Sequence, residues 1–124
     1  MLIFGCRSEQ DDFYYSEEWK QIKSQQGTDF MLITAFSRVN PSEGKVYVQH
    51  RIRESGELLS ELILSQNAVV YVSGRAKFMP KSVEKAFRDV IGSAMGVSDH
   101  DADPRATQYI AQMKKQRRYQ QEVW

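Results

Sequence analysis

Three short apolar runs and a final short strand-like run, separated by longer polar stretches with helical patterning, constrain this sequence more than any other feature. The first three runs are continuously apolar, as expected of strands buried on both faces. The four runs cover residues 2–6, 30–36, 68–72 and 119–124. Strands that alternate with helices in units of about 30 residues form a parallel sheet. The sequence therefore predicts a single α/β domain with a parallel, doubly wound sheet flanked by helices.

The polar stretches between these runs predict four helices. Asp11 or Asp12 is expected to cap the first, Gly27 to stop it, and Pro80 to occupy the first turn of the third. The four helices are expected over residues 11–26, 51–66, 80–95 and 105–117. The side chains expected to face inward are Phe13, Tyr14, Trp19 and Ile22, then Ile52, Leu58, Leu59, Leu62 and Ile63, and lastly Tyr109, Ile110 and Met113.

Composition excludes several classes of function. Seventeen basic and 16 acidic residues give a net charge of +1, which implies no general affinity for nucleic acid or anionic membrane. The single cysteine, Cys6, excludes an internal disulfide and a cysteine-rich metal site. His50 and His100 are too few and too far apart for a metal site, and His50 is expected to be a satisfied residue at a helix start. No targeting or membrane segment is recognised, so a cytoplasmic protein is expected.

Polar side chains follow the predicted strands at the points where the strands end. Open parallel sheets bind ligands at the carboxyl ends of their strands. The candidate residues there are Cys6 and Arg7 after the first strand, Ser37, Arg38, Lys45, Tyr47 and Gln49 after the second, and Ser73 after the third.

The group after the second strand suits a phosphomonoester. Arg38 offers a forked contact, and Ser37 and Lys45 complete the shell around a phosphate. Tyr47 is suited to stacking on adenine. The alternative interpretation is a solvated polar loop with a tyrosine packed against a helix, and on composition alone that alternative stays open.

The order and spacing of several segments resemble the NADPH-binding lobe of the diflavin reductases, a ferredoxin–NADP reductase-like family with a Rossmann-like sheet. The segments are Gly5-Cys6-Arg7, Ser37-Arg38, residues 45–50 and Glu122-Val123-Trp124. The resemblance covers essentially the whole chain. Residues 12–19, 47–54 and 76–80 look closest to the cytosolic NADPH-dependent members of the family that serve iron–sulfur assembly.

This resemblance implies a cofactor and a reaction. Such a lobe binds NADPH and positions it for hydride transfer to FAD, with electrons passing through FMN to an anamorsin-type iron–sulfur protein. The resemblance places Cys6 and Arg7 near the phosphate and ribose region. It assigns the adenosine 2′-phosphate end to Ser37, Arg38, Lys45, Tyr47 and Gln49.

The resemblance also assigns residues to the hydride-transfer end. Trp124 would cover the isoalloxazine ring of FAD and move aside for nicotinamide, although an aromatic anchor for the chain end is the alternative. Glu122 would be the acidic residue nearby, where the microsomal members have aspartate. Ser73 stands where those members have a cysteine, and Arg75 where an acid usually follows the glycine.

The family pattern implies parts that these 124 residues do not contain. The first strand of the lobe and its pyrophosphate loop are expected just before Met1, between the strands at residues 2–6 and 68–72. The FAD-binding and FMN-binding domains are expected outside the chain as well. We therefore expect an NADPH-binding lobe over residues 1–124, incomplete at its N-terminus and inactive alone.

A rival hypothesis is a non-catalytic α/β interaction module that binds an acidic partner or RNA. The observation behind it is the basic cluster at residues 114–118, near the end of the last predicted helix. Cations there also complement the helix dipole, which favours a solvated helix end.

Overall fold

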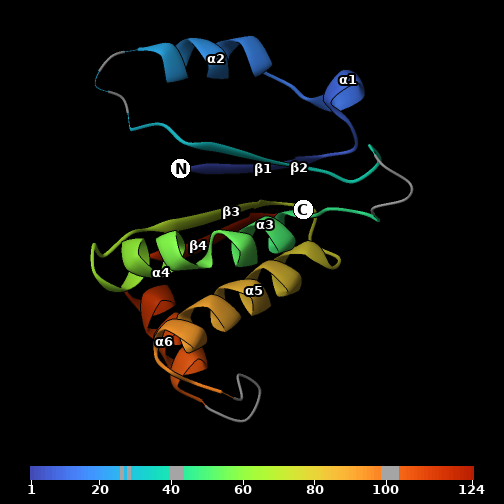
Figure 1. Ribbon diagram of the computed structural model, residues 1–124. Helices are drawn as coiled ribbons and strands as arrows, with labels where there is room; N and C mark the ends of the chain where they lie inside the picture. Colours follow the sequence, from blue (N-terminus) through green and yellow to red (C-terminus); the bar gives the residue numbers. More distant parts are fainter. Residues whose placement is uncertain (26, 28, 40–43, 99–103) are drawn as a thin grey trace. The chain divides into compact units, whose positions relative to one another are not determined.

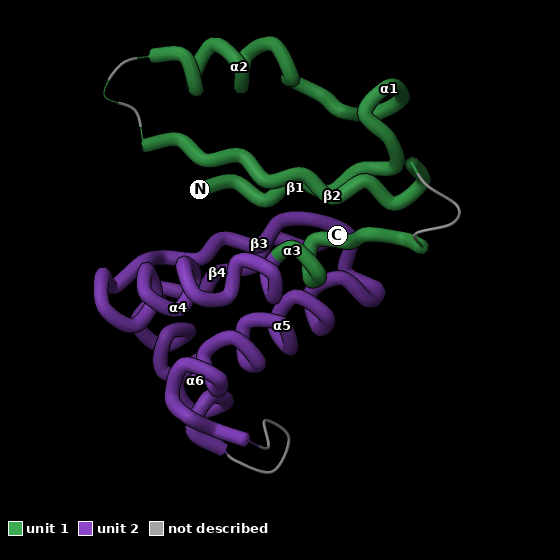
Figure 2. The backbone as a smooth tube through the Cα atoms, viewed as in Figure 1, with its two compact units in different colours: residues 1–51 green, residues 52–124 purple. Residues whose placement is uncertain are grey.

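The computed structural model describes residues 1–25, 27, 29–39, 44–98 and 104–124. His100 lies outside these residues. The described chain separates into two compact units, residues 1–51 and 52–124 (Figure 2), and each is described by itself. Both units combine parallel strands with helices, as Figure 1 shows, so the predicted α/β class is confirmed.

The first unit contains one parallel strand pair. Strand β1 (Leu2–Cys6) runs alongside β2 (Leu32–Phe36), with Leu2 opposite Leu32 and Cys6 opposite Phe36. The first strand has the predicted bounds, and the second begins two residues later than its apolar run. The parallel pairing was also predicted correctly.

The prediction of a single helix over residues 11–26 was wrong, because two helices occupy this part of the chain. Helix α1 (Glu9–Asp12) ends before Tyr15, whose φ of 63° is left-handed, and α2 (Ser16–Ser24) follows. Ser8, and neither aspartate, caps α1, because its side chain accepts the Asp11 N–H. The interruption turns Tyr14 outward, with 64% exposure, which contradicts its inward placement.

The β1–β2 pair carries helices on both faces. On one face, the Phe4 ring lies 4.8 Å from the Trp19 ring of α2 and 5.9 Å from the Phe13 ring. On the other, Gly5 faces Val48 at the start of α3 (Val48–Glu54). A β-carbon at Gly5 would lie 2.7 Å from Val48 Cγ1, so only glycine permits this approach.

The helix predicted over residues 51–66 is also divided. Helix α3 ends at Glu54, and α4 (Gly56–Leu64) begins after Ser55. Gly56 allows α4 to pack against α5, because a β-carbon there would meet Val90 Cγ2 at 3.3 Å. Ile52, Leu59 and Ile63 are buried as predicted, whereas Leu58 is 37% exposed.

The second unit contains the other strand pair and most of the buried side chains. Strand β3 (Val70–Gly74) runs parallel to β4 (Tyr119–Val123). Strand β3 begins and ends two residues later than predicted, so Ser73 lies inside the strand and not after its end. Helices α5 (Met79–Ala94) and α6 (Arg105–Lys115) pack with α4 against one face of this pair (Figure 1). Pro80 lies in the first turn of α5, as predicted.

The described helices do not include a membrane span. None of those in the part of the chain that the structure describes is both long and apolar enough to cross a bilayer.

Candidate functional site

The carboxyl ends of β1 and β2 form one continuous edge. The Ser37 N–H donates to the Cys6 carbonyl at 3.0 Å, and the Arg38 N–H donates to the Arg7 carbonyl at 2.8 Å. Backbone hydrogen bonds therefore continue one residue past β1 and two residues past β2. These bonds place two arginines, Arg7 and Arg38, on neighbouring strand ends, at the edge where parallel sheets bind ligands.

Arg7 is held by an acidic neighbour. Its Nε lies 2.8 Å from Asp12 Oδ2, and its backbone N–H donates to Asp12 Oδ1 at 2.9 Å. The hydrogen bond from Arg7 lowers the pKa of Asp12, and the same bond raises the pKa of Arg7. Both groups are therefore charged at neutral pH, and the Arg7 side chain remains 54% exposed.

Cys6 has the character of a structural thiol. It is half-buried, and its Sγ donates to the Ser8 carbonyl at 3.4 Å. Burial, and then the negative charge of Asp12, raise the pKa of the thiol. The raised pKa favours the protonated thiol at neutral pH, which is a poorer nucleophile than the thiolate.

Three further candidate residues lie just before α3 or within its first turn. Lys45 and Tyr47 are exposed, with Tyr47 at 42%, and Gln49 is half-buried. His50 fixes this helix start: its Nδ1 accepts the Tyr47 N–H at 3.2 Å, as in a capping box, and the two rings lie 5.8 Å apart. His50 is therefore satisfied, as predicted.

The donor set of the first unit fits a phosphate. The structure joins Cys6, Arg7, Ser37 and Arg38 through backbone hydrogen bonds. The contact between Gly5 and Val48 holds the start of α3, and with it Tyr47, against β1. Exposed guanidinium and ammonium groups combined with a hydroxyl and a phenol are the chemistry that binds a phosphomonoester near an aromatic base.

The remaining candidates lie together in the second unit. Ser73 of β3 is paired with Glu122 of β4, and both are exposed. The Trp124 N–H donates to the Gly74 carbonyl at 3.2 Å, and its carbonyl accepts from Ala76 N–H at 2.7 Å. Alternation along β4 puts Trp124 on the same face as Glu122, and its side chain is 75% exposed.

Sequence reasoning overlooked an aromatic side chain on that face. Tyr71 lies two residues before Ser73 and is 74% exposed. It lies within a continuous apolar run, whose pattern predicts burial on both faces, so nothing in the pattern marked it as exposed. The sequence pattern likewise indicates Asp12 only as a helix cap, because its bond to Arg7 depends on the turn between β1 and α1.

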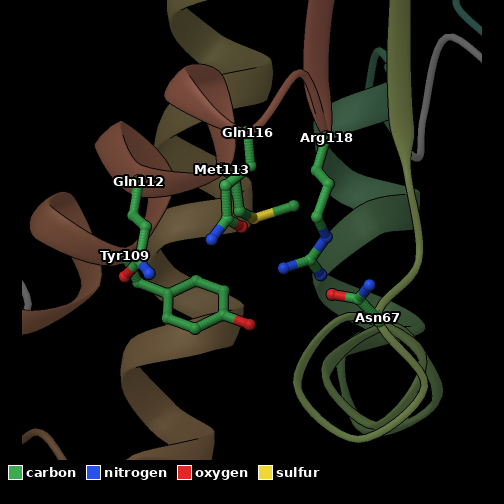
Figure 3. Close-up of a pocket in the computed structure, with 6 residues that line it drawn as sticks. All are labelled: Asn67, Tyr109, Gln112, Met113, Gln116 and Arg118. Carbon is green, nitrogen blue, oxygen red and sulfur yellow. The ribbon is translucent and has the colours of Figure 1, made fainter.

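A cavity of about 120 Å³ lies beside α6, and none of the candidate residues lines it. Figure 3 shows its lining residues, which are Asn67, Tyr109, Gln112, Met113, Gln116 and Arg118. Its cation is already engaged: Arg118 donates to the carbonyls of Ile63 at 2.8 Å and Ala68 at 3.2 Å. The cavity is therefore part of the scaffold that closes α4 onto β3.

The basic cluster behind the rival hypothesis is partly used inside the unit. Lys114 pairs with Glu84 of α5 at 2.8 Å, and Arg118 holds the two carbonyls just described. Within the described ranges, no group of three or more metal-ligating side chains occurs.

Comparison with known proteins assigns the family. The protein family described as "Oxidoreductase NAD-binding domain" matches residues 1–85. The chain is 45% identical over 124 residues to NADPH-dependent diflavin oxidoreductase 1 of Danio rerio, and 42% over 123 residues to that of Xenopus laevis. It is 40% identical over 124 residues to the NADPH–cytochrome P450 reductase of Aspergillus niger.

The chain spans about a fifth of the length of these relatives, namely 20%, 19% and 17% of the three. All of it, or all but one residue, is covered in each comparison. The matched family and the parallel strands flanked by helices agree with each other. The chain belongs to the oxidoreductase NAD-binding domain family, and over its whole length it is similar to part of an NADPH-dependent diflavin oxidoreductase.

Proposed function

We propose that this domain binds NADPH, with the adenosine 2′-phosphate at the edge formed by the ends of β1 and β2. The observation that carries this proposal is the hydrogen bond from Arg38 N–H to the Arg7 carbonyl, which sets two arginines side by side. Ser37, Arg38, Lys45, Tyr47 and Gln49 hold the phosphorylated ribose and the adenine. Cys6 and Arg7 lie toward the remaining phosphates and ribose.

The energetics of such contacts favour NADPH over NADH. Each hydrogen bond between a charged group and a phosphate contributes about 1.5–3 kcal/mol. Two of them, one from Arg38 and one from Ser37 or Lys45, would favour the phosphorylated cofactor by about two orders of magnitude or more.

Binding of adenosine 2′,5′-bisphosphate to the chain, measured by calorimetry, tests this site. We expect Arg38→Ala to weaken binding at least tenfold, while 5′-AMP, which lacks the 2′-phosphate, binds both proteins equally. Lys20→Ala is a matched control, because Lys20 is a cation of the same unit paired with Glu17 at 2.6 Å, away from the strand ends. Equal loss with both nucleotides, or with Lys20→Ala, would contradict the proposal.

Three candidates of the second unit, Ser73, Glu122 and Trp124, serve the nicotinamide end of the cofactor in the intact reductase. NADPH supplies a hydride to FAD there, and FAD and FMN are bound mainly outside this chain. Trp124 shields the flavin ring with a flat apolar face. Glu122 and Ser73 place a carboxylate and a hydroxyl beside the ring. Because the electron acceptor lies outside, the 124 residues alone are inactive; a measurable NADPH oxidase rate from the flavin-free chain would contradict this.

We further propose a cytoplasmic reductase that passes electrons from FMN to an anamorsin-type iron–sulfur protein. Similarity to proteins named NADPH-dependent diflavin oxidoreductase 1 supports this over a role with cytochromes P450, although P450 reductases match almost as well. Stopped-flow reduction of each acceptor by the intact enzyme tests the choice. Faster reduction of a cytochrome P450 than of the iron–sulfur protein would reverse it.

Residues 1–124 form most of one nucleotide-binding lobe in this proposal, with one further strand supplied from outside them. The strand pairing supports it, because among the described residues β1 pairs with β2 only and β3 with β4 only. Unpaired inner edges are a liability that proteins normally cover. Hydrogen exchange in the intact protein tests it: the amides on the unpaired edges of β1 and β3, which would face the further strand, should be protected there and exposed in the isolated chain.

A further inference from the structure

The geometry points to Asp12 as a positioning residue for the phosphate-binding arginine, Arg7. This inference rests on the proposed function, and it adds a residue that the family resemblance did not assign. Asp12 contacts no ligand in this scheme. It acts by fixing the direction of the Arg7 guanidinium before a nucleotide arrives.

Asp12 holds Arg7 through three hydrogen bonds. Oδ1 accepts from the backbone N–H of Arg7 at 2.9 Å and of Ser8 at 3.1 Å, while Oδ2 accepts from Arg7 Nε at 2.8 Å. One carboxylate therefore fixes both the turn after β1 and the side chain that leaves it. Asp12 is only 15% exposed, whereas Arg7 is 54% exposed.

The position of Asp12 is itself set by packing. Its neighbour Phe13 lies edge-on to Phe36 at 5.6 Å and 5.3 Å from Trp19 of α2. Phe36 is the last residue of β2 and directly precedes Ser37. The aromatic cluster thus ties the carboxylate to the same strand end that carries Ser37 and Arg38.

The bond through Nε leaves the other edge of the guanidinium for a ligand. Among the described residues, no side chain bonds to the two terminal nitrogens of Arg7, which are the pair that binds phosphate in a forked manner. The carbonyl of Arg7 also accepts from Arg38 N–H at 2.8 Å. The two guanidinium-bearing residues are therefore positioned as one unit.

Two opposing effects decide the sign of the contribution of Asp12. Its negative charge repels a bound phosphate, and at about 7 Å in water at physiological salt this lowers affinity roughly twofold. Ordering a long side chain in advance raises affinity by roughly 2- to 12-fold, because that cost is not incurred on binding. We therefore expect a net benefit of about threefold, larger at high salt, where the repulsion is screened.

A double-mutant cycle on the full chain tests the inference. Calorimetry with adenosine 2′,5′-bisphosphate compares the wild type with Asp12→Ala, Arg7→Ala and the double variant. We expect Asp12→Ala to weaken binding about threefold when Arg7 is present, and to leave binding unchanged or up to about twofold tighter once Arg7 is alanine, because only the charge repulsion then remains. Asp11→Ala is the matched control: this exposed acid bonds Ser8 and not Arg7, and its loss should change affinity less than twofold.

Each outcome decides the matter. An equal loss from Asp12→Ala in both backgrounds means a general structural role and overturns the inference, as does unchanged or tighter binding from Asp12→Ala when Arg7 is present. Asp12→Asn covers the case in which the alanine variant does not fold, because its amide oxygen still accepts the backbone N–H groups while the ion pair is lost. If the wild type binds the bisphosphate no better than 5′-AMP, the proposed function fails, and the inference fails with it.

Discussion

At the scale of single residues, the chemistry of the site edge depends on one ion pair. The hydrogen bond from Arg7 lowers the pKa of Asp12, and the backbone N–H of Ser8 lowers it further. The same carboxylate raises the pKa of the Cys6 thiol, after burial. One carboxylate therefore bonds an arginine and, together with burial, favours the protonated form of a neighbouring thiol.

The lowered pKa of Asp12 predicts a pH-dependent stability. A folded-state pKa below the ordinary carboxyl value of about 3.9 means that the contribution is present above that value. It is lost as pH falls through the lower folded-state pKa. We expect Asp12→Asn to lower the urea midpoint at pH 7, and the difference from wild type to shrink below about pH 4. A difference that stays constant from pH 7 to pH 2 would show that the charge is irrelevant.

At the scale of elements, a glycine positions a helix against a strand. Gly5 lacks the β-carbon that would lie 2.7 Å from Val48 Cγ1, and α3 begins at Val48. Tyr47 and Lys45 directly precede this helix, so their position depends on how closely α3 approaches β1. The Arg51 Nε bond to the Thr34 carbonyl, at 2.9 Å, secures the helix to β2.

Gly5→Ala should therefore affect stability and binding together. We expect a loss of about 1–3 kcal/mol in unfolding free energy, as for other overpacked sites, and at least threefold weaker binding of adenosine 2′,5′-bisphosphate. Chemical denaturation and calorimetry measure the two effects. Adding Val48→Ala makes room for the new methyl group and should recover part of both; a double variant worse than either single one would refute the packing argument.

At the scale of the whole molecule, burial is unevenly divided between the two units. Among the described residues, Ala35 is the only core side chain contributed by residues 1–51, and the others come from residues 52–124. The unit that carries the proposed phosphate site thus has the smaller core of its own. This supports the proposal that further chain, outside these residues, completes the sheet.

The proposed flavin shield requires the intact reductase for its test. We expect Trp124→Ala to reduce the preference for NADPH over NADH by about tenfold, because nicotinamide then no longer competes with an aromatic ring. Steady-state kcat/KM with both cofactors measures this preference. Tyr71→Ala is the matched control, since Tyr71 is an equally exposed aromatic on the same strand pair. Unchanged selectivity for Trp124→Ala, or an equal change for Tyr71→Ala, would contradict the shield.

The sequence alone determined the class of fold, the four strands and the parallel pairing, because apolar runs and their spacing depend on local pattern. It also determined the candidate residues at the strand ends, since parallel topology brings such ends together. Pattern did not reveal the breaks at Tyr15 and Ser55. A helical periodicity continues in the sequence across a single non-helical residue, whether the left-handed Tyr15 with φ 63° or Ser55 with φ −94° and ψ 18°.

Only the tertiary structure decided how the candidate residues are held. The Arg38 bond to Arg7 and the three bonds to Asp12 join residues whose geometry depends on a turn and on strand register. The left-handed Tyr15 and the aromatic cluster around Phe13 set that turn. Residue types at the strand ends thus follow from sequence, whereas the direction of each side chain follows from contacts between segments distant along the chain.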